Sequence, residues 1–140
     1  MKFGVVVTLA VAGIVGATAG CAKEVPVPPA PKVAVGGHGL NVSRPVTCAK
    51  TDHNINIAIG QAPTLLTAVL TDANPPQVNS VVFNNVNDDT LVYRAGSKSS
   101  WPRATATKNG NSYTISGKAT VLDSATHPAT KDFKIEAVCP

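Results

Sequence analysis

The sequence is poor in aromatic and charged residues. Aromatic side chains make up 4% of its 140 residues and charged side chains 14%, with a formal net charge of +4. The lysines and arginines are spread singly rather than in runs. Binding to nucleic acid usually needs clustered cations, and single strands need aromatic platforms on which bases stack. We therefore expect no nucleic-acid partner.

Catalytic signatures are also missing. The chain has no G-x-S-x-G elbow, no H-E-x-x-H pair, no glycine-rich phosphate loop and no C-x-x-C motif. His38, His53 and His127 are scattered without the spacing of metal ligands. Asp88 and Asp89 are adjacent, and adjacent residues of a strand face opposite sides, so they are a poor acid and base pair. We expect no catalytic residue, no metal site, no cofactor and no enzymatic activity.

Of the few features that are present, the first is the stretch of residues 1–21. Lys2 is followed by a short apolar segment, which gives way to small residues directly before Cys21. A positive start, an apolar middle and small residues at the end are typical of an export signal. A transmembrane helix would need about 20 consecutive, predominantly apolar residues. We expect residues 1–20 to be a signal peptide that the mature protein lacks.

The end of this signal resembles the lipobox of bacterial lipoproteins. Ala19, Gly20 and Cys21 fit that motif, whereas Thr18 stands where leucine or valine is usual. The resemblance implies that the thiol of Cys21 takes a diacylglycerol and that Cys21 becomes the first residue after cleavage. The alternatives are an ordinary secretory signal with an incidental cysteine, or an uncleaved anchor.

The segment of residues 21–31 is rich in proline. Four prolines lie between Pro26 and Pro31, and each lacks a backbone donor and fixes its own φ angle. Such a segment favours extended polyproline II structure and acts as a semi-rigid spacer. At about 3 Å per residue it would hold the following domain roughly 30 Å from the lipid.

The remaining two cysteines, Cys48 and Cys139, form an even pair in an exported chain. In an oxidising compartment such a pair favours a disulfide. A shared metal or two buried thiols are the alternatives, but no second pair of ligands accompanies these cysteines. A bridge between them would close nearly the whole domain.

Residues 32–140 carry the signals of short strands and turns. Isoleucines alternate with polar or small residues at Ile55, Ile57 and Ile59, the period of a half-buried strand. Further strands are indicated at 32–35, 46–49, 78–86 and 90–94, and over 65–70, where a short helix is the alternative. Glycine, asparagine, aspartate and proline between them mark turns.

The clearest hairpin joins residues 103–108 to the strand that begins at Ser112. Asn109 and Gly110 between the arms are residues that tolerate a positive φ in a tight reversal. The last strand places Phe133 and Cys139 on one face. Several short strands without a helical pattern indicate one all-β domain, a small antiparallel β-sandwich closed by one disulfide.

Five sequence segments resemble the mycobacterial nineteen-kilodalton lipoprotein antigen family. They are NINIAIG at residues 54–60, AVLTDANPP at 68–76, NVN at 85–87, ATATK at 104–108 and FKIE at 133–136 before Cys139. The resemblance implies an exported surface lipoprotein, anchored by lipid to the outer side of the cell membrane and associated with the wall. It also implies a disulfide-closed β domain without enzymatic activity.

The family is known for antigens whose acylated N-terminus is sensed by a host toll-like receptor, and an adhesin role has been proposed. The spacer departs from the family pattern, which has a glycosylated linker rich in threonine and serine, because residues 22–31 contain no hydroxyl side chain. The leading hypothesis is a non-enzymatic envelope antigen of this kind. The alternative is a carrier module whose sandwich encloses a lipid or small apolar ligand.

Overall fold

The computed structural model describes residues 29–42, 45–97, 102–122 and 129–140, and all regular elements in these ranges are β-strands. The signal, most of the spacer and His127 lie outside the described residues. The ten strands are β1 (Lys32–Val35), β2 (His38–Leu40), β3 (Val46–Thr51), β4 (Asn54–Gln61), β5 (Thr64–Thr71), β6 (Val78–Val86), β7 (Asp89–Arg94), β8 (Thr105–Asn109), β9 (Ser112–Val121) and β10 (Thr130–Val138).

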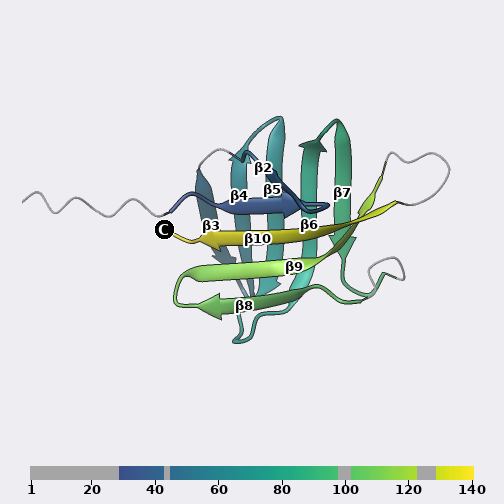
Figure 1. The fold of residues 1–140 in the computed structure, drawn as a ribbon. Helices are drawn as coiled ribbons and strands as arrows, with labels where there is room; N and C mark the ends of the chain where they lie inside the picture. Colours follow the sequence, from purple (N-terminus) through teal and green to yellow (C-terminus); the bar gives the residue numbers. More distant parts are fainter. Residues whose placement is uncertain (1–28, 43–44, 98–101, 123–128) are drawn as a thin grey trace, which may run out of the picture.

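The strands form one antiparallel sheet that folds into two layers. Its order is β2-β1-β10-β9-β7-β6-β5-β4-β3, and β8 pairs with β9 beside this path. In Figure 1, β3 to β7 form the rear layer, and β1, β10, β9 and β8 run across them in front. The prediction of a small antiparallel β-sandwich is confirmed, with the added finding that both layers belong to one curled sheet.

The two layers bury the alternate residues that the sequence pattern indicates. Ile55, Ile57 and Ile59 of β4 are buried, as are Phe133 and Ile135 of β10, while the residues between them are more exposed. Successive side chains of a strand point to opposite faces, so alternation in sequence becomes one apolar face per strand. The run at residues 65–70 is a strand rather than a helix, because it pairs with β4 and β6.

The turns have the residues that positive φ angles require. Asn87 and Asp88 between β6 and β7 have φ angles of 51° and 68°, which asparagine and aspartate tolerate better than most residues. The β8–β9 hairpin is confirmed, but its two central residues are Gly110 and Asn111, one position later than the pair singled out in the sequence. Only Gly110 of these takes a positive φ, at 59°.

Strand β9 joins the two layers. It pairs with β10 over nine residues, but its other edge is shared: residues 112–116 pair with β8, and Thr120 and Val121 pair with β7. Gly117 lies between these two partners. A Cβ atom there would stand 2.6 Å from the Ala104 Cβ and 3.1 Å from a ring carbon of Phe133. The absence of a side chain therefore lets the chain of Ala104 approach β9.

Gly117→Ala is expected to lower the free energy of unfolding by about 1–3 kcal/mol, the usual cost of overpacking a filled site. Urea unfolding would measure this loss. Gly39→Ala is the matched control, because a Cβ at Gly39 meets nothing within 4 Å and its φ is not positive. Equal effects of the two changes would contradict the close approach at Gly117.

Candidate functional site

The chain enters the domain beside the end of β10. Lys32 at the start of β1 is paired with Glu136, two residues before the end of β10. Pro31 is buried although it precedes the strand, and Pro29 and Ala30 line a hollow of about 260 Å³ together with residues of β9 and β10. The last residues before β1 therefore lie against the sheet, which fixes where a preceding spacer leaves the domain.

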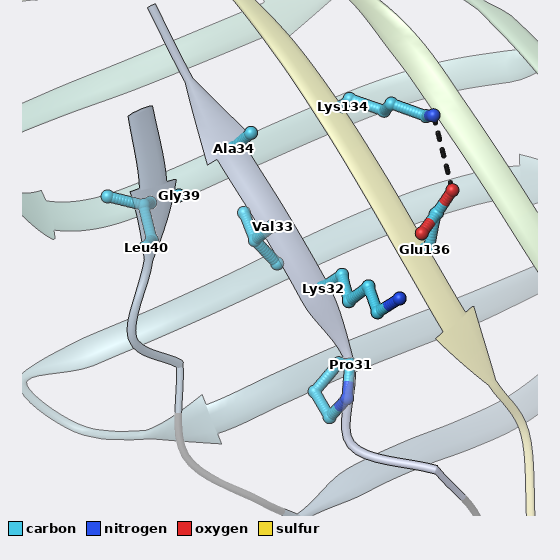
Figure 2. A pocket seen from close by; sticks show the side chains of 8 residues that line it. All are labelled: Pro31, Lys32, Val33, Ala34, Gly39, Leu40, Lys134 and Glu136. Carbon is cyan, nitrogen blue, oxygen red and sulfur yellow. Dashed lines mark ion pairs between the residues drawn. The ribbon is translucent and has the colours of Figure 1, made fainter. Parts of the chain in front are cut away.

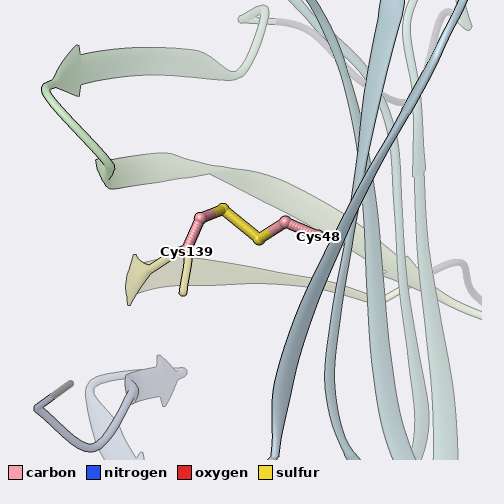
Figure 3. Close-up of a disulfide and its surroundings, with 2 residues drawn as sticks. All are labelled: Cys48 and Cys139. Atoms are coloured by element: carbon pink, nitrogen blue, oxygen red, sulfur yellow. A yellow bond between two sulfur atoms is a disulfide. The ribbon is translucent and has the colours of Figure 1, made fainter. Parts of the chain in front are cut away.

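The disulfide lies at this same end. Cys48 of β3 is bonded to Cys139, which follows β10, and their Cα atoms are 5.8 Å apart. Figure 3 shows the bridge reaching from β3 to the end of β10 across the space between the layers. The Cys139 N–H also donates a hydrogen bond to the carbonyl of Asn111, at 2.8 Å. The predicted pairing of the two cysteines is confirmed, and it ties together both layers and the β8–β9 turn.

An open groove of about 390 Å³ runs along the outer surface of β1, β2 and β10. Figure 2 shows the Lys134–Glu136 ion pair on β10, with Lys32, Val33 and Leu40 on the neighbouring strands. The Lys134 Nζ lies 3.2 Å from a Glu136 oxygen, and both side chains are well exposed. Exposed pairs of this kind contribute little to stability. The groove is a mildly charged surface feature without a nucleophile and base pair.

The titratable residues considered from the sequence lie apart on turns. His38 opens β2 and His53 lies in the β3–β4 turn, and both are exposed. Asp88 is in the β6–β7 turn, whereas Asp89 begins β7 and faces the Lys131 Nζ at 3.5 Å. In the described ranges, no three His, Cys, Asp or Glu side chains gather as a metal site would need, and no helix is long and apolar enough to cross a membrane.

The space between the layers is filled by side chains. Nine large residues there have less than 2% of their surface exposed, among them Tyr93, Phe83 and Ile57. The phenol oxygen of Tyr93 accepts the Ala104 N–H at 3.1 Å. A carrier that encloses an apolar ligand needs an interior space, and this packing gives that hypothesis no support.

Three features of the fold were not found from the sequence. Strand β2 is short and lies in a glycine-rich segment, so its sequence shows no alternation of apolar and polar residues. The Tyr93–Ala104 hydrogen bond and the close approach at Gly117 join residues of different strands. Only Gly117 left a signal, since an isolated glycine inside a strand indicates close backbone approach.

Comparison with known proteins places the chain in a family. A family model described as Mycobacterium 19 kDa lipoprotein antigen matches residues 26–139. Lipoprotein LpqH of Mycobacterium tuberculosis strain H37Rv is 47% identical over 111 residues, covering 78% of this chain and 69% of the relative. Lipoprotein LpqH of Mycobacterium avium is 47% identical over 110 residues, covering 77% and 67%. The chain therefore belongs to the mycobacterial 19 kDa lipoprotein antigen family, as the resemblance of its motifs had indicated.

Proposed function

We propose that the protein is a non-enzymatic envelope lipoprotein, acylated on Cys21 after removal of residues 1–20. Its membership of a lipoprotein antigen family is the observation that carries this proposal. The position of Cys21 supports it, because the cysteine directly follows the small residues of an export signal. Residues 21–31 are then the spacer, and residues 32–140 are the displayed domain.

The length of the spacer limits the distance between the domain and the membrane. Pro29, the first described residue, lies eight positions after Cys21, so eight residue steps separate them. In polyproline II structure these would span about 25 Å, at roughly 3.1 Å per residue. The end that carries the Cys48–Cys139 bridge would thus be the end nearer the membrane. One acyl chain binds a bilayer only weakly, so the anchor needs at least two chains.

Two roles follow from a domain held in this way. We propose that the acylated N-terminus is the part that a host toll-like receptor senses, which is what the resemblance to the family implies. An adhesin role would instead belong to the β domain, which presents exposed strand edges and grooves to solvent. The two are separable, since only adhesion would persist in a protein without lipid.

The intact mass of the detergent-extracted protein tests the anchor. We expect loss of residues 1–20, added mass from two or three acyl chains, and a gain of two hydrogens on reduction of the Cys48–Cys139 bond. The Cys21→Ser variant should lose all lipid mass and leave the membrane fraction, since serine offers no thiol to acylate. Thr18→Leu, which restores the usual lipobox residue, is the control and should keep the lipid. A cleaved wild-type protein without lipid would overturn the proposal.

A further inference from the structure

A second hollow lies where the segments that lead into β6 and β8 meet, away from the disulfide. It measures about 340 Å³ and is lined by residues 75–79, which lead into β6, by residues 103–106, which lead into β8, and by Tyr93 and Ala95. This volume is at the lower end of the range of about 300–1,000 Å³ that is typical of ligand sites. The buried phenol of Tyr93 lies at its wall, since it bonds the N–H of Ala104 there.

The hollow is open because the pairing between β6 and β8 stops after one residue pair. Gln77 and Thr105 form a single bridge. Pro76 and Pro75, which would come next opposite Ala106 and Thr107, have no N–H with which to continue a ladder. Among the described strands, β8 is paired along its length only with β9. The sequence therefore leaves one side of β8 without a partner strand.

The backbone of Lys108 points toward this unpartnered side. Gly110 and Asn111 form a two-residue turn, so Asn109 and Ser112 are the hydrogen-bonded pair that closes the hairpin. Hydrogen-bonded and non-hydrogen-bonded pairs alternate along an antiparallel ladder. Lys108, opposite Tyr113, is therefore in a non-hydrogen-bonded pair, and its N–H and C=O point away from β9. A free edge of this kind is a template for an added strand.

The sequence segment that contains β8 is basic. Residues 90–122 contain no Asp or Glu but five basic residues, namely Arg94, Lys98, Arg103, Lys108 and Lys118. Arg103 is exposed at the hollow, and the Lys108 Nζ lies 5.6 Å from the centre of the Tyr113 ring. Within the described ranges, neither takes part in the ion pairs, which join other lysines to Asp72, Asp89, Asp132 and Glu136.

We propose that the hollow and the free edge of β8 bind an extended peptide segment that carries acidic side chains. Its backbone adds a strand to β8, as in other complexes formed by strand addition. Arg103 and Lys108 are five residues apart and so lie on opposite faces of the strand, and the peptide places carboxylates beside each of them. A second copy of this chain is a poorer occupant. Strand β8 and the residues before it, 103–109, contain no acidic side chain that a second copy could place beside Arg103 and Lys108. The proposal does not depend on acylation.

Two fluorescein-labelled eight-residue peptides test the site, one repeating Val-Val-Glu-Glu and one repeating Val-Val-Lys-Lys, so that each carries its charges on both faces of an extended strand. Each is titrated into the detergent-solubilised mature protein, labelled with ¹⁵N for NMR. We expect the glutamate peptide to shift the amide signals of residues 77–79 and 104–109, and the lysine peptide to leave them unchanged. Fluorescence anisotropy then gives the affinity.

Two double variants distinguish a specific binding site from a general attraction of the acidic peptide to a basic protein. Arg103→Gln with Lys108→Gln should weaken binding of the glutamate peptide at least tenfold. Lys50→Gln with Lys131→Gln removes the same charge elsewhere and should change the affinity less than twofold. NMR spectra of both variants verify that they are folded. Equal weakening by both pairs, shifts centred on other strands, or no binding of the glutamate peptide would overturn the proposal.

Discussion

Replacing both bridge cysteines, Cys48→Ala with Cys139→Ala, is expected to lower the free energy of unfolding by about 4–5 kcal/mol. The bond joins residues 91 positions apart, so it restricts nearly the whole unfolded domain, and the chain-entropy estimate grows with the logarithm of loop length. Domains of this size are commonly stable by only about 5–15 kcal/mol. Urea unfolding of the variant and the wild-type protein would measure the loss.

Without the bridge, strand β3 should lose more protection from hydrogen exchange than the other strands. Strand β3 ends the sheet and pairs only with β4, and four of its six residues are exposed. Hydrogen exchange should therefore accelerate first at Thr47 and Ala49 of the variant, before β5 and β6. The reduced wild-type protein is the control and should match the variant. A loss under about 1 kcal/mol would mean that packing alone holds β3 in place.

Strand positions could be predicted from the sequence because each strand buries one face. The isoleucines of β4 and the alternate residues of β10 are apolar at every second position, and burial follows that period in the structure. Such alternation is a local property that can be recognised within a short stretch of sequence. The hairpins were equally accessible, since Gly110, Asn87 and Asp88 are residues that positive φ angles favour.

The order of the strands in the sheet was not accessible in this way. The hairpin identified β8 as one neighbour of β9, but the alternation in β9 is equally compatible with β7 or β10 as a further neighbour, because each partner leaves the same face buried. In the structure β9 pairs with all three, and Gly117 marks the point where one partner replaces another. An isolated glycine in a strand indicates a bulge or close approach but does not say which chain approaches.

Of the candidate sites, one could be predicted from the sequence and the other could not. The Cys48–Cys139 pairing needed only a count of cysteines and an export signal, which is why the sequence predicted it. The hollow beside β8 combines Pro75 and Pro76 with Arg103 and Tyr93, which are brought together by the folding of the sheet. The absence of acidic residues from 90–122 is visible in the sequence, but it becomes informative only once β8 is known to have a free edge.

Phe133→Ala is expected to lower the free energy of unfolding by about 3–5 kcal/mol, the usual cost of emptying a buried aromatic site. Phe133 is 3% exposed, and its ring lies edge-on to Phe83 at 5.3 Å and to Tyr93 at 6.2 Å between centroids. Since the whole chain has only six aromatic residues, this cluster contains half of them and joins β6, β7 and β10 across the two layers.

Phe133→Leu is the matched variant that separates lost volume from lost aromatic contact. Leucine fills most of the site but gives up the edge-on ring pairs, each of which contributes about 0.5–1.5 kcal/mol beyond the area it buries. Phe133→Leu should therefore lower the free energy of unfolding clearly less than Phe133→Ala does, but still measurably. Tyr93→Phe keeps the ring and removes the hydroxyl that bonds the Ala104 N–H, leaving a buried donor at a cost of about 1–3 kcal/mol. If Phe133→Ala cost less than Tyr93→Phe, the aromatic cluster would not be the centre of the core, and the join between the layers would rest on the hydrogen bond from Ala104 instead.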